Sequence, residues 1–412
     1  MKVLIITQYF WPEVFRINDL VLGLQQLGHH VTVLTGKPNY PGGKLFPGYR
    51  LFGGWHEDYH GVEVVRVPLV PRGNGNGLRL ALNYASFAFL ASVLGPFKCR
   101  GSYDVILVYE PSPITVGLPA LVMKYLKQAP ILFWVQDLWP ESLSATGAVS
   151  SRLVLRCVET LVRLIYKGSD RILVQSLAFS EPIRNLGVSE DRIRYFPNSA
   201  EDFYRPMPEG DVEAVGELPV GFRVMFAGNI GAAQGFDTIL AAAERLREHQ
   251  DIHWLILGDG RLASWLKQEI DRRGLSGRVH LLGSHPVESM PHWFAAADAM
   301  LVTLKRNPIF ALTIPAKVQS YMACAKPIIA ALDGEGARVI HEAGAGLAVP
   351  ADDAGALAQA VLDMYKMTDS ERAAMGARAR RYFEAHFERR MLLDRLDQWI
   401  RELAQRREPC AS

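Results

Sequence analysis

The 412-residue sequence is poor in cysteine and carries almost no net charge. Its four cysteines are scattered without the spacing of a zinc site or a redox pair, so we expect neither a structural metal nor a disulfide framework. Its 45 basic and 43 acidic residues leave a net charge of +2, which is too small for a general nucleic-acid-binding protein. The composition, 49% hydrophobic, favours an ordinary globular protein of a reducing compartment.

Long hydrophobic runs are also rare. The opening run, Val3–Ile6, is too short for a signal peptide, so export is not expected. One stretch, 78–97, is almost wholly apolar and approaches the roughly 20 residues of a membrane span. Basic residues flank it on both sides: Arg72, Arg79, Lys98 and Arg100. Its few polar residues favour a helix that lies in a membrane interface or packs on the protein, and both alternatives stay open.

Two segments of the chain show the same order of elements: a buried strand, a turn, a helix and a second strand. They start at Lys2–Thr7 and at Phe222–Gly228, and this order predicts two parallel α/β domains of the Rossmann type. The Pro-rich, acidic stretch 196–219 is the best linker, so we place the domains at 1–200 and 201–385. Further strands are expected at 62–67, 105–109, 131–135, 171–175, 279–282, 299–303 and 328–331, and a charged helical region at 371–405.

Three loops of the second half suit a phosphate-bearing ligand. Gly228–Gly235 and Gly258–Gly260 follow expected strands, and glycine there lets a ligand approach the backbone and the amides of a following helix. In the third, Pro315 stands at an expected first helical position and Lys317 in the first turn, where a cation opposes the helix dipole. A shared anion would explain that lysine; the alternative is a solvated side chain.

Acidic side chains follow two expected strands of the first half. Asp137 and Glu141 come after 131–135, and Glu110 ends the preceding strand. With Trp139 between them, the two carboxylates suit sugar recognition, because carboxylates accept hydrogen bonds from hydroxyls and an aromatic ring stacks on C–H surface. The alternative is that Asp137 caps the next helix while Glu141 is solvated. Three histidines are expected in loops without a catalytic role: His56, His60 and His285.

Several motifs, taken in order, resemble the retaining glycosyltransferases of family 4. These motifs are Leu27–Val33, Phe196–Asn198, Gly258–Gly260, Tyr321–Ile329 and Gly344–Pro350. Four more resemble a subgroup that includes the WbuB-type fucosamine transferases of bacterial surface polysaccharide synthesis: Tyr9–Glu13, Pro38–Pro41, Gln136–Glu141 and Ile314–Lys317. The resemblance covers essentially the whole chain. It implies the GT-B fold, in which two Rossmann-like domains face a cleft and the C-terminal helix, 386–412, crosses back to the first domain.

The resemblance also implies a function. A sugar, expected to be an N-acetylated amino sugar, would pass with retention from a UDP-sugar to a lipid-linked glycan in O-antigen, capsule or exopolysaccharide synthesis. The enzyme would be cytoplasmic and peripheral on the inner membrane face, attached through 78–97. No two aspartates stand two residues apart, so the metal clamp of the other major transferase architecture is missing and no metal or cofactor is expected. A UDP-sugar 2-epimerase and a non-catalytic nucleotide-sugar binder remain open alternatives.

This sequence departs from the family at the donor site. Asn229 and Gln234 stand where the family usually has an Arg and a Lys, and its two usual glutamates fall on Leu312 and Ser320. Lys317 therefore becomes the expected partner of the donor diphosphate. The expected donor-binding residues are Gly228, Asn229, Gly231, Gln234, Gly258, Asp259, Gly260, Lys317 and Ser320. The expected catalytic pair is Asp137 and Glu141, and the expected acceptor-binding residues are Trp11, Glu13, Asn18, Tyr40, Glu110 and Trp139.

Overall fold

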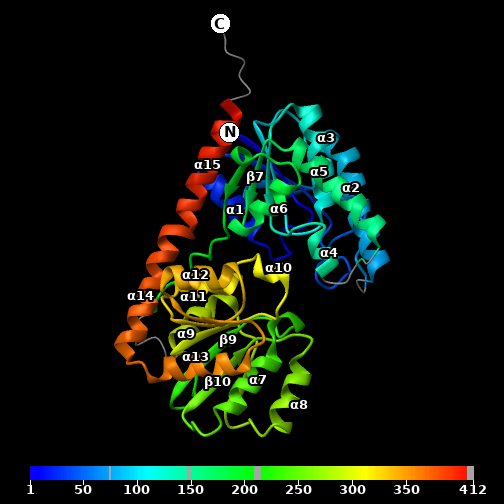
Figure 1. Ribbon diagram of the computed structural model, residues 1–412. Helices are drawn as coiled ribbons and strands as arrows, with labels where there is room; N and C mark the ends of the chain where they lie inside the picture. The colour runs from blue at the N-terminus through cyan, green and yellow to red at the C-terminus, as the bar shows by residue number, and fades with distance from the viewer. Residues whose placement is uncertain (74–75, 146–148, 150, 208–214, 406–412) are drawn as a thin grey trace. The chain divides into compact units, whose positions relative to one another are not determined.

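The computed structural model describes residues 1–73, 76–145, 149, 151–207 and 215–405 (Figure 1). The chain divides into two compact units. Unit 1 comprises Met1–Pro197 and Arg390–Ser412, and unit 2 comprises Asn198–Arg389. The boundaries expected from the sequence, at 200 and 385, differ from these by a few residues. Each unit is a mainly parallel sheet with helices on both faces, which is the Rossmann-like architecture predicted for the GT-B fold.

The sheet of unit 1 has the strand order β3-β4-β2-β1-β5-β6-β7-β8, and its pairs are parallel except β3–β4. The strands are β1 Lys2–Ile6, β2 His30–Gly36, β3 His56–Tyr59, β4 Val62–Val67, β5 Val105–Glu110, β6 Ile131–Val135, β7 Arg171–Val174 and β8 Ile193–Tyr195. The four further strands expected in this half are confirmed. Strands β3 and β8 were missed, because β3 is a polar edge strand and β8 has only three residues. The prediction of a loop at His56 was therefore wrong.

Helices cover both faces of this sheet (Figure 1). They are α1 Arg16–Gln26, α2 Gly77–Lys98, α3 Gly117–Lys127, α4 Glu141–Ala145, α5 Arg152–Gly168, α6 Ser180–Asn185 and α15 Arg389–Gln405. Helices α1 and α15 share one hydrophobic core with the strands, whereas α2, α3 and α5 lie together. Helix α15 is also tied to unit 1 by ion pairs, with 2.9 Å between Arg171 and Glu402 and 2.8 Å between His29 and Asp397. The C-terminal helix thus packs on the first domain, as the resemblance implied.

The charged helical region expected at 371–405 forms two helices. Helix α14, Asp369–His386, belongs to unit 2, and α15 belongs mainly to unit 1. Between them, the fully buried Phe387 packs in a core of unit 2. The same hydrophobic spacing therefore serves two different cores, which the sequence pattern did not distinguish.

The sheet of unit 2 has the order β11-β10-β9-β12-β13-β14, with parallel pairs throughout. Its strands are β9 Phe222–Ala227, β10 Ile252–Leu257, β11 Val279–Gly283, β12 Ala299–Thr303, β13 Ile328–Ala331 and β14 Gly346–Val349. Its helices are α7 Phe236–Arg245, α8 Ala263–Arg272, α9 Met290–Ala295, α10 Pro308–Ala311, α11 Ala316–Ala323, α12 Glu335–Ala343, α13 Ala354–Lys366 and α14. Strand β14 was not predicted, because its four residues are only partly buried.

Strand order determines where each unit is expected to bind a ligand. In unit 1 the chain adds strands on one side of β1 and then on the other, so the strand order reverses at β1, which pairs with both β2 and β5. In unit 2 it reverses at β9, which pairs with β10 and β12. Open parallel sheets bind ligands at the carboxyl ends of strands beside such a reversal, because the loops there diverge. The predicted glycine loops of unit 2 follow β9 and β10, and Trp11 and Glu13 of unit 1 follow β1. Other predicted residues lie on helices, such as Lys317 and Ser320 on α11 and Asn18 on α1.

Candidate active site

The two glycine loops of unit 2 are joined at the carboxyl ends of β9 and β10. The Gly228 amide donates to the Leu257 carbonyl at 2.9 Å, and the Ile230 amide donates to the Asp259 carbonyl at 2.8 Å. Gly258 has a φ of +132°, and a Cβ there would lie 1.9 Å from the Gly228 carbonyl oxygen. Only glycine tolerates this approach. The structure therefore brings together the two loops predicted to bind the donor.

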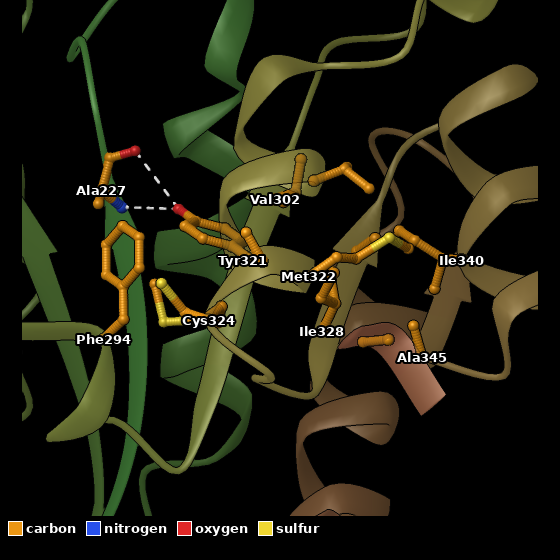
Figure 2. Close-up of a cluster of buried hydrophobic side chains, with 14 of the residues drawn as sticks. Ala227, Phe294, Val302, Tyr321, Met322, Cys324, Ile328, Ile340 and Ala345 are labelled. Carbon is orange, nitrogen blue, oxygen red and sulfur yellow. Dashed lines mark hydrogen bonds between the residues drawn. The ribbon is translucent and has the colours of Figure 1, made fainter. Parts of the chain in front are cut away.

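Helix α11 is fixed against β9 by a buried tyrosine (Figure 2). The Tyr321 hydroxyl accepts from the Ala227 amide at 3.1 Å and donates to the Ala227 carbonyl at 3.4 Å. The helix begins one residue later than predicted, because Pro315 is its N-cap rather than its first residue. Lys317 nevertheless lies in the first turn, and the tyrosine anchor holds that turn against the end of β9.

The Lys317 amine lies against the first glycine loop, Gly228–Gly235. It donates to the side-chain oxygen of Gln234 and stands 3.7 Å from the centroid of the Phe226 ring. A Cβ on Gly228 would lie 2.6 Å from the Lys317 Cε. Burial lowers the pKa of Lys317 to about 7, and among the described residues no carboxylate forms an ion pair with it. A desolvated amine without a carboxylate partner is well suited to accept an anionic ligand.

The other expected donor residues have local partners. The Asn229 side chain lies against Gly231 and Gly260, where a Cβ would be 2.7 Å and 2.5 Å from its atoms. The amides of Gly231 and Gln234 donate within their own loop, so they are less suited to bind phosphate than predicted. The Asp259 carboxylate accepts from the Gly260 amide at 2.7 Å. Ser320 donates to the Ala316 carbonyl one turn earlier, at 3.3 Å. Their donor contacts stay predictions.

Sequence reasoning missed two residues near this site. Lys305 follows β12, and its amide donates to the Ala233 carbonyl at 2.8 Å, which places an exposed cation beside the glycine loop. A lysine just after the central strand β12 was the available signal. Gln319 on α11 is fully buried, and neither polar atom of its amide has a hydrogen-bond partner in the described part of the chain. Nothing in the sequence distinguished it.

The expected catalytic acids of unit 1, Asp137 and Glu141, follow β6, and the expected acceptor residue Glu110 ends the neighbouring strand β5. The Gln136 amide donates to the Glu110 carbonyl at 3.0 Å, which brings Asp137 beside Glu110. Glu110 is fully buried, and this burial together with the Asp137 charge raises its pKa well above the usual range. Burial raises the pKa of Asp137 to about 6, although hydrogen bonds from Ser142 and Trp139 oppose the shift. Asp137 is therefore a carboxylate of unusual basicity.

A tyrosine that sequence reasoning missed stands close to these acids. Tyr166 of α5 is fully buried, and its hydroxyl has no hydrogen-bond partner among the described residues. Burial first, then the charges of Glu110, Glu141 and Asp137, raise the pKa of Tyr166 well above its usual value. One carboxylate oxygen of Glu141 is also buried without a partner. The site therefore combines several groups that can hold or release a proton, and Tyr166 escaped notice because it lies on a helix rather than after a strand.

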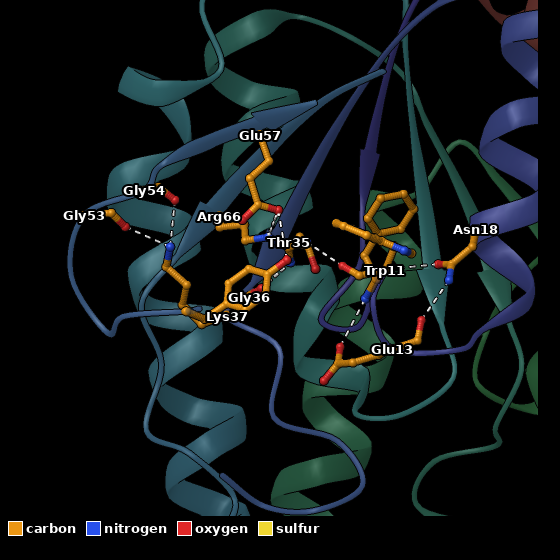
Figure 3. A network of polar contacts seen from close by, with 12 residues as sticks. Trp11, Glu13, Asn18, Thr35, Gly36, Lys37, Gly53, Gly54, Glu57 and Arg66 are labelled. Atoms are coloured by element: carbon orange, nitrogen blue, oxygen red, sulfur yellow. Dashed lines mark hydrogen bonds and ion pairs between the residues drawn. The ribbon is translucent and has the colours of Figure 1, made fainter. Parts of the chain in front are cut away.

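The expected acceptor residues at β1 and β2 form a polar network (Figure 3). The Glu13 carboxylate accepts from the amides of Asn39 and Tyr40 at 2.8 and 2.7 Å. Asn18 donates to the Glu13 carbonyl at 2.7 Å and accepts from the Trp11 amide at 3.2 Å. Burial raises the pKa of Glu13 despite its amide partners. Glu13 and Asn18 thus hold the loops, while Trp11 and Tyr40 stay partly exposed, at 40% and 37%.

Comparison with known proteins shows sequence similarity over both units and a shared fold. Residues 14–199 match the model of the glycosyl transferase 4-like domain, and residues 221–367 match that of glycosyl transferases group 1. The probable glycosyltransferase WbjE of Pseudomonas aeruginosa is 27% identical over 343 residues, which cover 81% of this chain and 83% of that protein. WcaI of Escherichia coli K12, a putative colanic acid biosynthesis glycosyl transferase, is 24% identical over 335 residues, or 78% and 81% of the two chains. The crystal structure of Anabaena HepE in complex with UDP has a TM-score of 0.70 at 15% identity, covering 98% of this chain and all of that one.

Two Rossmann-like units, with a C-terminal helix that packs on the first unit, define a protein of the GT-B fold. The two family models together span most of the chain. The protein is a glycosyltransferase of group 1, with a first domain of the family 4-like type, and it is distantly related to WbjE and WcaI.

Proposed function

We propose that this glycosyltransferase moves a sugar, with retention of configuration, from a UDP-sugar to a lipid-linked glycan in surface polysaccharide synthesis. The observation that carries the proposal is Lys317, an amine for which the described part of the chain offers no carboxylate partner and which lies against Gly228, where the strand order of unit 2 reverses. HepE, of the same fold, binds UDP, and WcaI is assigned to colanic acid biosynthesis. The subgroup resemblance of the sequence motifs favours an N-acetylated amino sugar.

In the proposed reaction, the bond between the sugar C1 and the diphosphate oxygen breaks, and a bond from C1 to the acceptor oxygen forms on the same face. Lys317, with Lys305 nearby, offsets the charge on the departing diphosphate. The Asp137 carboxylate takes the proton of the acceptor hydroxyl, for which its raised pKa suits it.

Product masses give the decisive test. The protein is incubated with a panel of UDP-sugars and a membrane lipid extract. UDP release that requires the lipid extract, together with a glycolipid heavier by one sugar, would support transfer. Interconversion of the sugar without UDP release would instead indicate an epimerase. Binding of UDP-sugar with no turnover under any acceptor would indicate a sensor.

We also propose that the reaction needs no divalent metal. Lys317 and Lys305 supply positive charge where a metal clamp otherwise would, and the sequence has no Asp-x-Asp motif. We therefore expect the initial rate to change by less than about twofold when EDTA is added to the dialysed enzyme. A rate that collapses with EDTA and returns with Mg²⁺ or Mn²⁺ would contradict this part of the proposal.

The proposed location is the inner face of the cytoplasmic membrane, and α2 supports it. By length and composition, α2 is the one helix in the described part of the chain that could cross a membrane. One side of it is integrated in unit 1: Phe87 is fully buried, and Asn83 hydrogen-bonds to Gln8 and to the Val70 carbonyl. The opposite side carries an apolar stripe, made of Leu78, Leu82, Ala85, Phe89, Val93 and Phe97.

This stripe is unusual for a soluble helix, which normally presents polar side chains to water. Leu78, Phe89 and Phe97 are 66–75% exposed. A helix with one face in the protein and an apolar face outward suits docking in a membrane interface better than spanning it. The two sequence alternatives, core helix and membrane helix, therefore describe two faces of the same helix.

Vesicle binding tests this location. We expect the protein to sediment with vesicles containing phosphatidylglycerol, and the bound fraction to fall with salt, since Lys98 and Arg100 would each contribute about 1 kcal/mol near an anionic surface. Serine at Leu82, Phe89 and Phe97 should remove most of the binding without unfolding the protein, because all three are exposed. Phe52→Ser, at an exposed aromatic outside α2, is the matched control. Equal binding by the triple variant and the control would contradict the docking role of the stripe.

A further inference from the structure

Arg72, in the loop before α2, and Arg79, in the first turn of α2, have no acidic partner among the residues that the structure describes. Between Glu63 and Asp104 the sequence contains no aspartate or glutamate, and the described part of the chain shows no carboxylate paired with Arg72 or Arg79. Arg66, only six residues earlier, is fully buried and is bound by Glu57 at 2.6 Å and by the Gly36 carbonyl at 3.1 Å. The unpaired guanidinium groups are therefore a property of this loop and not of the arginines of the unit in general.

Arg72 is held in a defined place on an aromatic cluster. Its Cζ lies 4.9 Å from the centroid of the Tyr40 ring and 5.7 Å from that of Tyr9, and one guanidinium nitrogen donates to the Tyr9 hydroxyl at 2.9 Å. The rings of Tyr9 and Phe15 are stacked at 5.1 Å, which stiffens the platform. A guanidinium has five N–H donors in a fixed fork, so this arrangement leaves donors for a ligand.

The backbone beneath Arg72 is equally constrained. The Arg72 amide donates to the Asn39 side-chain oxygen at 3.0 Å, and Asn39 is almost fully buried. The Gly73 amide donates to the Gly43 carbonyl at 2.8 Å. Gly43 has a φ of +74°, and a Cβ there would lie 1.7 Å from the Gly73 carbonyl oxygen, so only glycine lets the two loops meet. The loop thus positions Arg72 before any ligand arrives.

Arg79 brings a second cation to the same loop. A Cβ on Gly73 would lie 2.8 Å from the Arg79 Nε, so the Arg79 side chain folds back over the residue that follows Arg72. Arg79 stands in the first turn of α2, whose N-cap is Asn76. The positive end of a 22-residue helix adds to the attraction for an anion. Two guanidinium groups and a helix start suit a phosphate or diphosphate ester.

The neighbouring surface indicates which phosphate ester. Leu78, 75% exposed, stands beside Arg79 and begins the apolar stripe of α2. An anion site and an apolar stripe that start at the same helix end suit an amphiphile with a phosphate head and a hydrocarbon tail. We propose that Arg72 and Arg79 bind the phosphate or diphosphate group that joins the acceptor glycan to its lipid. This inference rests on the proposed lipid-linked acceptor and names the part of it that this site recognises.

Binding to defined vesicles tests the site. The probe is a polyprenyl diphosphate in phosphatidylcholine vesicles, compared with phosphatidylglycerol vesicles of equal surface charge. We expect tighter binding to the diphosphate lipid, and a loss of about ten- to a hundredfold in Arg72→Gln and in Arg79→Gln, since a charge-assisted bond to phosphate is lost. Arg72→Lys should lose part of the affinity, because it keeps the charge without the fork. Arg184→Gln, which removes an exposed charge on α6, should bind like the wild type.

Several outcomes would overturn the inference. One is that the wild type binds the two kinds of vesicle equally, because the affinity would then depend only on the surface charge of the vesicle. Another is equal affinity of Arg72→Gln and Arg184→Gln for the diphosphate lipid, with both variants folded and both binding UDP. Inorganic pyrophosphate should displace the wild type, but not Arg72→Gln, from the diphosphate-lipid vesicles if the site binds the phosphate group itself.

Transfer assays distinguish this inference from the proposed function. If the wild type moves sugar to a lipid-linked glycan and both arginine variants do so with unchanged KM for the lipid, the function stands and the inference falls. If no transfer to any lipid occurs, yet diphosphate-lipid binding depends on Arg72, the proposed function falls and the phosphate site remains. A raised KM with an unchanged kcat in Arg72→Gln supports both.

Discussion

Replacement of Asp137 by Asn should slow sugar transfer by about a hundred- to ten-thousandfold, which is the usual contribution of a positioned acid or base. The asparagine keeps the size of the side chain and its hydrogen-bonding capacity, but cannot take a proton. UDP binding should be unchanged, because the donor loops belong to unit 2. The measurements are the single-turnover rate with a defined acceptor and the UDP dissociation constant. A loss of less than about threefold in a folded variant would assign Asp137 a structural role instead.

The pH dependence gives a second measurement on Asp137. Because its pKa is raised to about 6, the fraction of the carboxylate, and with it the transfer rate, should increase with pH through about 6. The sign for stability is the opposite: a group whose pKa is higher in the folded than in the unfolded state loses stabilisation as pH rises through the folded value. Asp137→Asn should therefore unfold at the same or a higher temperature than the wild type at pH 8, while its activity falls. Glu141→Gln should show a milder loss of rate.

Replacement of Lys317 by Ala should lower donor turnover by about ten- to a hundredfold, since charge-assisted contacts to phosphate contribute roughly 1.5–3 kcal/mol each. The side chain is held by Gln234 and Phe226 and pairs with no carboxylate of the described ranges, so its removal leaves no described acid unpaired. UDP affinity measured by calorimetry and the steady-state rate report the effect. Lys267→Ala, at an exposed lysine on α8, is the matched control. Turnover equal to that of the control would remove Lys317 from the donor site.

Proton uptake distinguishes a phosphate contact from a packing role at Lys317. Its pKa in the free protein is about 7, and a bound diphosphate would raise that value. Binding above pH 7 should then take up a proton, and UDP affinity should fall as the pH increases from 7 to 9. Lys317→Arg keeps its charge over this range, so its affinity should depend less on pH. A flat wild-type profile would contradict the diphosphate contact.

Local sequence patterns predicted an element correctly where the residues of that segment alone determine its structure. Strands β4, β6, β12 and β13 are rich in apolar residues that favour a strand, and their predicted bounds were correct to the residue. Strand β3 was missed because it is polar and is stabilised by antiparallel pairing with β4 rather than by burial. The family resemblance placed the start of the C-terminal helix at 386, close to Arg389, where α15 begins. The hydrophobic spacing alone runs through this break, because the Phe387 ring is buried in a core that the local pattern does not reveal.

By itself, the sequence determined the α/β class, the two domains and the position of Asp137 and Lys317, because strand-end glycines and charges after apolar runs are local signals. The tertiary structure alone decided which charges have partners. It bound Glu13 to the amides of Asn39 and Tyr40, and it placed Arg72 on the Tyr9 hydroxyl with no acid of the described residues beside it. It also divided α2 into a buried face and an exposed apolar face. The partners of a charged side chain and the burial of a residue depend on segments that are distant in the chain and meet only when the sheet assembles. No local sequence pattern can therefore predict them.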